Sequence, residues 1–246
     1  MFSSIKNIGL TPKSVSIKDF VHEWHTKFRD YLLTLEHQFD PAHKIDHVDR
    51  VTKTALNLAE QENAEIKIIL PAIMLHECVP VSKFSQNRAM ASTTSAEKAR
   101  KLLIQWEYPN EYLGAIEHAI KGHSFSANIL PASLEAKVVQ DADRLDALGV
   151  IGFARTLGVG FKHNNSLYDT KQPIPYGRSV DDNKYILDHF YQKLFVISGT
   201  MQTKAGTLEA KRRHQIMEKM IENLCLEIGV PYFSYEEYAT AKANRE

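Results

Sequence analysis

Apolar residues recur mostly at three- and four-residue spacing along this chain of 246 residues, and this spacing limits the folds open to it. The spacing places apolar side chains on one face of an α-helix, whereas a half-buried β-strand needs strict alternation of apolar and polar residues. Such alternation is hard to find here. The sequence therefore predicts an all-α fold, a helical bundle forming one domain.

Several helices follow from the apolar pattern and from the residues that interrupt it. Asp40-Pro41 and Gly229-Val230-Pro231 are typical helix breaks, and Ser133 is a suitable N-cap. The third helix is apolar on nearly all sides, which indicates a buried central position, and Pro71 is expected to kink it. The predicted helices cover residues 16–39, 45–63, 66–78, 85–106, 109–121, 133–157, 183–197 and 205–228.

Residues 158–182 read as a long irregular connection, rich in glycine, asparagine and proline. Loops of this length inside compact domains are often lids or binding elements. We expect an N-terminal extension at 1–19, the main domain at 20–228 and a C-terminal tail at 229–246, with a short docked helix as the alternative for that tail.

The charges of the chain cancel, since it has 30 basic and 30 acidic residues. We therefore expect no nucleic-acid partner, because a global positive field is missing. An apolar run of roughly 20 residues, enough to cross a bilayer, is also missing, so no membrane association is expected. Two distant cysteines, Cys78 and Cys225, fit a reducing compartment, and we expect the cytoplasm. The sequence does not indicate an oligomeric state.

Four acid or imidazole side chains stand out, because a metal ion could gather them into one site. They are His47, the adjacent pair His76-Glu77, and Asp143, all in segments predicted to be helical. Two nitrogens and two carboxylates suit Mn, Fe, Co, Ni or Zn, and suit Mg less well because of the imidazoles. A metal held by several ligands with one open position can activate a water molecule. The predicted cofactor is therefore a divalent metal ion.

Read together, the three segments that carry these residues resemble the HD-domain metal-dependent phosphohydrolase superfamily. The similarity extends over about residues 20–228 to a subgroup of small bacterial HD hydrolases. It implies an all-α HD-domain bundle, a phosphoester or phosphoanhydride substrate, and ligand roles for His47, His76 and Asp143. Further residues that carry the resemblance include His43, Pro80, Lys83, Arg88, Ala96-Glu97-Lys98-Ala99, His118-Ala119-Ile120, His123-Ser124-Phe125, Asp146-Ala147-Leu148-Gly149 and Leu187-Asp188-His189-Phe190.

Glu77 departs from the family pattern, which has Asp directly after the second ligand histidine. The added methylene moves the carboxylate by up to about 1.5 Å, one carbon–carbon bond. Catalytic constellations usually tolerate misplacements nearer to about 0.5 Å. Backbone adjustment or a different binding mode could absorb the difference, and weakened or lost activity is the alternative.

His118 and His123 are candidate catalytic residues. At five residues' separation they point roughly 140° apart on a straight helix, so they converge only if the helix ends at Gly122. In two-metal members of the family, additional histidines from this region hold a second ion. A second metal, a phosphate contact and a purely structural role all stay open for the two histidines.

Asp141, Asp143 and Asp146 are spaced so that they cannot all face one centre. Two residues correspond to about 200° of helical rotation, so Asp141 and Asp143 point apart. The resemblance gives Asp143 the ligand role, which leaves Asp141 as a cap or as a residue that orients a ligand. Asp146 lies one turn after Asp143, and it could activate water as a catalytic residue or pair with a cation.

Three cations are candidates for binding substrate phosphate: Lys83, Arg88 and Arg144. Ordinary surface ion pairs are the alternative, and this alternative is stronger for Arg88 than for Lys83. His43 lies four residues before His47, on the same helical face if the helix includes it. It would then orient a ligand or lie next to the N-cap.

The main functional hypothesis is a metal-dependent phosphohydrolase that acts on a small phosphorylated molecule, a nucleotide or phosphate ester. Glu77 motivates a second hypothesis, a catalytically weakened protein that binds a nucleotide or phosphometabolite. A third, weaker hypothesis is an HD-type diiron oxygenase, because some HD-like proteins use paired irons and extra histidines. A nuclease is disfavoured by the balanced charge.

Overall fold

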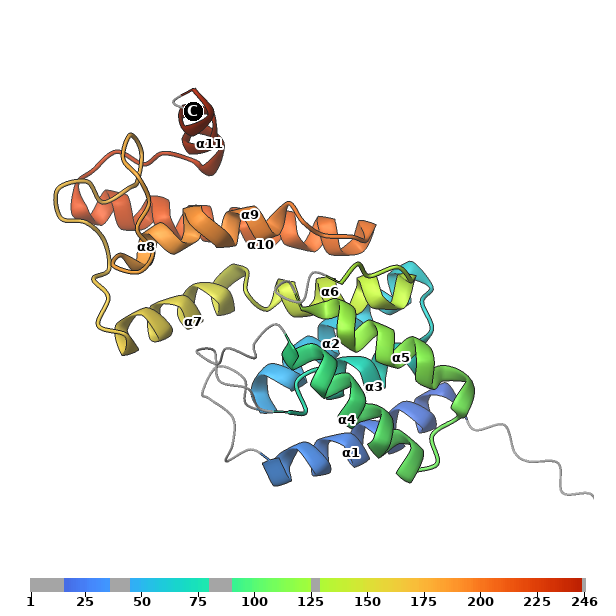
Figure 1. Ribbon diagram of the computed structural model, residues 1–246. Coiled ribbons are helices and arrows are strands. Elements are labelled where there is room, and N and C mark those ends of the chain that lie inside the picture. Colours follow the sequence, from blue (N-terminus) through green and yellow to red (C-terminus); the bar gives the residue numbers. More distant parts are fainter. Residues whose placement is uncertain (1–15, 36–44, 80–89, 125–128, 245–246) are drawn as a thin grey trace, which may run out of the picture.

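The computed structural model describes residues 16–35, 45–79, 90–124 and 129–244, and helices build all of its architecture (Figure 1). The described ranges contain no β-strand, and an isolated bridge joins Ser166 to Tyr185. The predicted all-α fold is confirmed.

The first six helices form the layer that contains most of the buried core. α3 lies at its centre, and every residue from Ile69 to Leu75 is buried, as the apolar sequence predicts. α2, α5 and α6 pack around α3, while α1 and α4 cover the outer sides (Figure 1). These helices are α1 (Ile17–Leu35), α2 (Ile45–Glu62), α3 (Ile66–Leu75), α4 (Ala91–Gln105), α5 (Asn110–His123) and α6 (Leu134–Leu145).

The later helices form a second layer, in which the long helix α10 packs against α2, α6 and α7 (Figure 1). Gly229 ends α10 in the left-handed conformation, with φ of 74°, as the sequence predicts. The elements of this layer are α7 (Gly149–Lys162), α8 (Ile186–His189), the π-helical turn η4 (Phe190–Leu194), α9 (Phe195–Ser198), α10 (Lys204–Ile228) and α11 (Tyr235–Ala243).

A docked helix, the predicted alternative to a plain tail, follows α10. Ser234 begins α11 with a capping box in which its side chain and that of Glu237 exchange hydrogen bonds with backbone N–H groups. Tyr238 is buried against the second layer. Tyr191 of η4 stacks edge-on against Tyr238, which fastens the C-terminal helix to the body.

The prediction of one helix over 133–157 is wrong, because two helices occupy this range. α6 begins after the predicted N-cap, Ser133, and ends at Leu145. Gly149 then adopts φ of 72°, a conformation that favours glycine, and α7 leaves in a new direction. Arg213 of α10 donates a 2.6 Å hydrogen bond to the carbonyl of Leu145, which satisfies an acceptor at the end of α6.

The boundary of the irregular connection was also predicted wrongly. α7 continues through Gly158 and Gly160 to Lys162, so the irregular segment covers residues 163–185. A Cβ atom at Gly160 would lie 2.4 Å from the Ile186 side chain. This glycine therefore allows α8 to approach α7 closely, and it does not mark a loop.

Other helix ends differ by a few residues from the prediction. α3 ends at Leu75, so His76 and Glu77 lie in the turn that follows it. α5 continues through Gly122 to His123, so Gly122 is not the C-cap that the sequence suggested. Residues 36–39 of the first predicted helix and residues 85–89 of the fourth lie outside the described residues.

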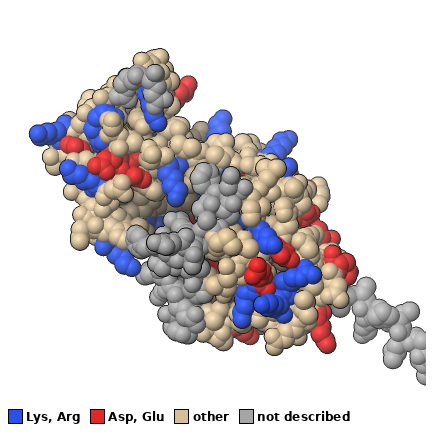
Figure 2. Space-filling model, in the orientation of Figure 1, with Lys and Arg blue, Asp and Glu red and all other residues tan. Residues whose placement is uncertain are grey.

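The surface carries mixed charge. Figure 2 shows Lys and Arg interspersed with Asp and Glu on the face in view, in accord with the balanced totals. Among the described residues, no helix is both long enough and apolar enough to span a bilayer.

Asp141 of α6 joins the two layers. Its buried carboxylate accepts hydrogen bonds from the backbone N–H groups of Gln202 and Thr203, at 2.8 Å each, and from the Thr203 hydroxyl at 2.7 Å. These bonds fix the residues that begin α10. Asp141 thus anchors the connection that leads into α10, and the side chain of Thr203 caps that helix.

Replacing Asp141 by alanine should destabilise the protein by about 2–4 kcal/mol, because several buried donors lose their acceptor. Urea unfolding followed by circular dichroism measures this free energy. The exposed Asp30 provides the control, since Asp30→Ala should change stability by less than about 0.5 kcal/mol. Equal stability of the two variants would contradict the proposed junction.

Candidate metal centre

Four helices place the predicted ligands next to one another. His47 lies in the first turn of α2, His76 and Glu77 directly follow α3, and Asp143 lies in the last turn of α6. The fourth helix, α5, ends at His123, whose ring is 4.9 Å from that of His76 between centroids. Side chains from distant parts of the sequence therefore form one cluster.

Each histidine of the cluster is oriented by an acceptor at its Nδ1 atom. The Nδ1 of His47 lies 2.8 Å from a carboxylate oxygen of Asp146. The Nδ1 atoms of His76 and His123 each lie 2.6 Å from the backbone carbonyl three residues earlier. A carboxylate or carbonyl can only accept, so Nδ1 carries a proton and Nε2 is directed into the cluster, where it offers its lone pair whenever the ring is neutral.

The distances within the cluster are too long for hydrogen bonds and suit a shared ion. Oδ1 of Asp143 lies 3.6 Å from Nε2 of His47 and 3.7 Å from Nε2 of His76. Oε2 of Glu77 lies 3.9 Å and 4.0 Å from the same two nitrogens. Ligands about 2.1 Å from one ion are separated by roughly 3 Å at right angles and roughly 4 Å when nearly opposite. His47, His76 and Asp143 have ligand atoms within 4.8 Å of one another, so these three residues fit a divalent metal ion. Glu77 lies beside the same two histidines.

Glu77 reaches the cluster although its side chain is one methylene longer than that of Asp. It lies in the turn after α3 and is not held in helical register. Together with His76 and His123, it also forms a second group with potential ligand atoms within 4.8 Å of one another. The carboxylate of Glu77 therefore lies beside the histidines, in a different group of potential ligands from Asp143.

The cluster has a buried side and a side open to solvent. The side chains of His47 and His76 are 3% and 0% exposed, whereas those of Glu77 and Asp143 are 34% and 29% exposed. A water molecule or substrate can therefore approach past the carboxylates. A site with fixed buried ligands and one accessible side is the arrangement that hydrolytic metals require.

Electrostatics in the cluster favour cation binding. Burial alone would lower the pKa of His76, but the carboxylates of Asp143 and Glu77 raise it to about 9. Burial opposes ionisation of Asp143, yet His76 and the other histidines hold its pKa well below the ordinary value. Burial and the nearby His76 lower the pKa of His123. The negative charge of the two carboxylates is therefore available to a metal.

Asp146 lies behind His47, on the side of the ring opposite Nε2. Its carboxylate is 5% exposed and accepts hydrogen bonds from Arg50 and Arg155 besides its contact with His47. This placement favours a positioning role over the predicted catalytic role. The two arginines were missed in the sequence. Arg50 has a local signal, because it lies one turn after His47, but Arg155 is in another helix.

Comparisons with known proteins agree with this geometry. The HD domain family model matches residues 45–148, a range that includes all four candidate ligands. YpgQ of Bacillus subtilis is 28% identical over 186 residues, which cover 74% of this chain and 82% of that protein. The crystal structure of YpgQ in complex with ADP has a TM-score of 0.66 at 26% identity, covering 84% of this chain and 96% of that chain.

One solved structure decides the family. An HD-superfamily hydrolase from Bacillus thuringiensis is 32% identical, with a TM-score of 0.68 over 86% of this chain and 100% of that chain. This chain belongs to the HD superfamily. Its HD-domain bundle brings His47, His76, Glu77 and Asp143 close together.

The other predicted site residues of this HD protein have different positions. His123 joins the cluster, whereas Nε2 of His118 accepts a 3.1 Å hydrogen bond from the backbone N–H of Ala132. Arg144 donates to the carbonyl of Thr200 at 2.8 Å and to its hydroxyl at 3.0 Å, which ties α6 to the connection before α10. Three predicted residues lie outside the described residues: His43, Lys83 and Arg88.

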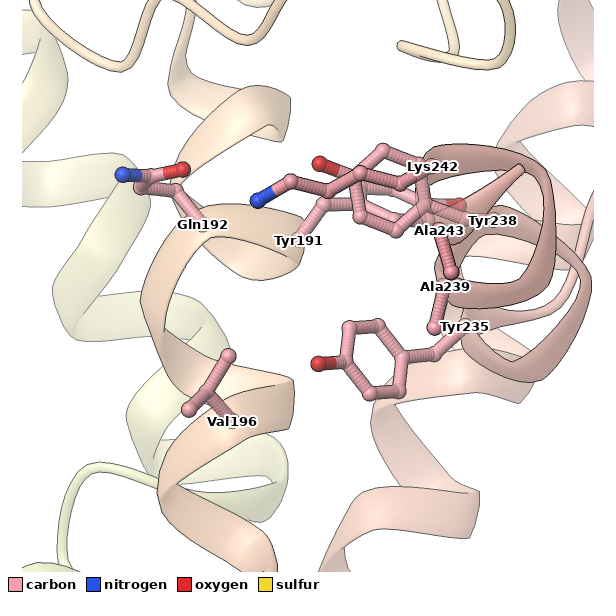
Figure 3. Close-up of a pocket in the computed structure, with 8 residues that line it drawn as sticks. All are labelled: Tyr191, Gln192, Val196, Tyr235, Tyr238, Ala239, Lys242 and Ala243. Atoms are coloured by element: carbon pink, nitrogen blue, oxygen red, sulfur yellow. The ribbon is translucent and has the colours of Figure 1, made fainter. Parts of the chain in front are cut away.

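A groove of about 250 Å³ lies elsewhere on the HD protein, where α11 packs beside η4 and α9 (Figure 3). Its lining contains no residue of the metal cluster. Figure 3 shows the side chains that enclose it: Tyr191, Gln192, Val196, Tyr235, Tyr238, Ala239, Lys242 and Ala243.

Metal binding at pH 7 should release about one proton, because His76 has its pKa raised from 6.5 to about 9 and must lose a proton to act as a ligand. Calorimetric titration with Mn²⁺ in buffers of different ionisation enthalpy measures this proton count. The release should fall to about half a proton near pH 9 and should vanish only well above that pH, where His76 is neutral. A count of zero at pH 7 would contradict the account.

The same pKa predicts how stability depends on pH when a chelator is present. The pKa of His76 is higher in the folded protein than in the unfolded chain, so the protonated His76 stabilises the fold. This stabilisation is fully present below pH 6.5 and is lost as the pH rises through about 9. Urea unfolding at a series of pH values should show this decrease. His76→Gln should remove it, and persistence of the decrease in that variant would assign it to other groups.

Proposed function

We propose that the protein is a metal-dependent phosphohydrolase that acts on a small phosphorylated substrate, most simply a nucleotide. The convergence of two imidazole Nε2 atoms with the partly exposed side chains of Asp143 and Glu77 carries this proposal. The likeness to an HD-superfamily hydrolase supports the reaction class, and the ADP complex of YpgQ supports a nucleotide.

The residues of the cluster have distinct tasks in this proposal. His47, His76, Asp143 and Glu77 would hold a divalent metal, and the chemistry that such a metal would supply is the activation of a water molecule as the nucleophile. His123 stays uncharged at neutral pH and keeps its Nδ1 proton on the carbonyl of Ile120, so its Nε2 can take up a proton or hold a second ion.

Cations would complete the site by balancing the charge of the substrate phosphate. Lys83, Arg88 and Arg144 keep this role as a proposal. Balanced overall charge favours a small substrate over a nucleic acid. Both cysteines are free and buried, in accord with the proposed cytoplasmic location.

The first test is a screen of nucleotides and phosphate esters against protein loaded in turn with Mn²⁺, Co²⁺, Ni²⁺, Zn²⁺, Fe²⁺ and Mg²⁺, with phosphate or pyrophosphate release as the readout. At least one metal and substrate pair should give turnover, and Asp143→Asn should lower it by at least about 100-fold, because a ligand is lost. Thr94→Ala, at an exposed position of α4, is the control that should keep turnover. Absence of turnover with the metal shown to be bound would falsify the hydrolase proposal.

A second candidate function, binding without hydrolysis, is favoured by Glu77 alone. The variant Glu77→Asp distinguishes the two, because it restores the family's residue at the cluster. If the natural chain is the hydrolase, this variant should change kcat by no more than about 10-fold, since Glu77 already reaches the ligands. Turnover that occurs only in Glu77→Asp, with equal Mn²⁺ binding by both proteins, would establish the binding function instead.

A further inference from the structure

We infer that Arg155 of α7 is a positioning residue of the metal centre, acting through Asp146 on the ligand His47. Arg155 lies beyond residues 45–148, the range that matches the HD domain, so this inference extends the centre into the second layer. The inference rests on the metal site proposed above, and it assigns Arg155 no contact with substrate.

The contacts form a continuous chain from α7 to the cluster. Nη1 of Arg155 donates a short hydrogen bond to Oδ2 of Asp146 and lies 3.5 Å from the backbone carbonyl of the same residue. The same Oδ2 atom lies 2.8 Å from Nδ1 of His47. One carboxylate oxygen therefore contacts both the arginine and the ligand histidine.

Arg50 also holds Asp146, but it cannot replace Arg155. Its guanidinium donates from Nε to Oδ1 at 2.8 Å and from Nη2 to Oδ2 at 3.1 Å. Arg50 belongs to α2, the helix that also carries His47, so it fixes Asp146 only relative to its own helix. Arg155 comes from a different helix and contacts both the side chain and the backbone of Asp146.

The position of Asp146 makes this contact relevant to the metal. Asp146 caps the C-terminus of α6, three residues after the ligand Asp143, at the turn between α6 and α7. By holding this turn, Arg155 fixes the distance between the carboxylate that orients His47 and the helix that presents Asp143. Loss of the contact should let the His47 ring rotate and should weaken the binding of a metal.

An ordinary arginine–aspartate pair elsewhere in the protein provides the matched control. Arg178 donates to both carboxylate oxygens of the fully buried Asp188, which lies in α8 and outside the cluster. Arg178→Gln and Arg155→Gln each remove a guanidinium from a buried carboxylate. The two variants should lose stability similarly, and they should differ in metal affinity.

The experiment is a titration of the full chain with Mn²⁺, in which electron paramagnetic resonance measures free Mn²⁺ and urea unfolding measures stability. Arg155→Gln should bind Mn²⁺ at least about 10-fold more weakly than the natural chain, and Arg178→Gln should bind it equally. Arg155→Lys should recover most of the affinity, because both contacts come from one nitrogen that an ammonium group can replace.

A double-variant cycle separates a positioning role from a general loss of structure. If Arg155 acts through Asp146, the double variant Arg155→Gln with Asp146→Asn should bind Mn²⁺ no more weakly than Asp146→Asn alone. Unchanged affinity in Arg155→Gln, an equal loss in Arg178→Gln, or additive losses in the cycle would each overturn the inference. If Arg155→Gln does not fold, Arg155→Met keeps the apolar stem and is judged by the same outcomes.

The outcomes for the natural chain separate this inference from the proposed function. If the natural chain does not bind Mn²⁺, both the metal site and the inference fail. If it binds Mn²⁺ and Arg155→Gln binds it equally well, only the inference fails. Turnover is not needed for either result.

Discussion

The hydrogen bonds that fix the Nδ1 atoms of three buried histidines are the interaction on which the site depends. A buried imidazole can turn either nitrogen toward a neighbour, and a metal can be bound only by a nitrogen that faces it with a free lone pair. Here a carboxylate holds His47, while backbone carbonyls within their own helices hold His76 and His123. Every Nε2 therefore faces one point before any ligand arrives, which reduces the reorganisation that metal binding would require.

The second helical layer supports the first at two acidic residues of α6. Asp141 accepts a hydrogen bond from the backbone N–H of Thr203 at the start of α10. Asp146, five residues later, accepts one from Arg155 of α7. The carboxylate between them, Asp143, faces the histidines. Asp141 and Asp143 point in different directions because two residues correspond to about 200° of helical rotation, and Asp146 lies at the C-cap, beyond the last residue of α6. Packing of the later helices and geometry of the metal cluster are consequently linked through this single helix.

Local spacing was enough to predict the helical class, and short motifs were enough to single out four candidate ligands that the fold places close together. The partners of those ligands depend on tertiary structure. On one continuous helix, Arg155 would lie nine residues and about 180° from Asp146, so contact would be impossible. The turn at Gly149 gives α7 a new direction, and this allows Arg155 to contact Asp146. A continuous helix over residues 133–157 does not predict this contact. The role of Gly160 also depends on tertiary structure. It provides space for the Ile186 side chain and does not end a helix.

Anomalous diffraction from a crystal grown with Mn²⁺, recorded at the manganese absorption edge, tests the central claim most directly. The account predicts a peak about 2 Å from Nε2 of His47, from Nε2 of His76 and from an oxygen of Asp143. A folded protein with no peak among these side chains, or with a peak bound only elsewhere, would contradict it.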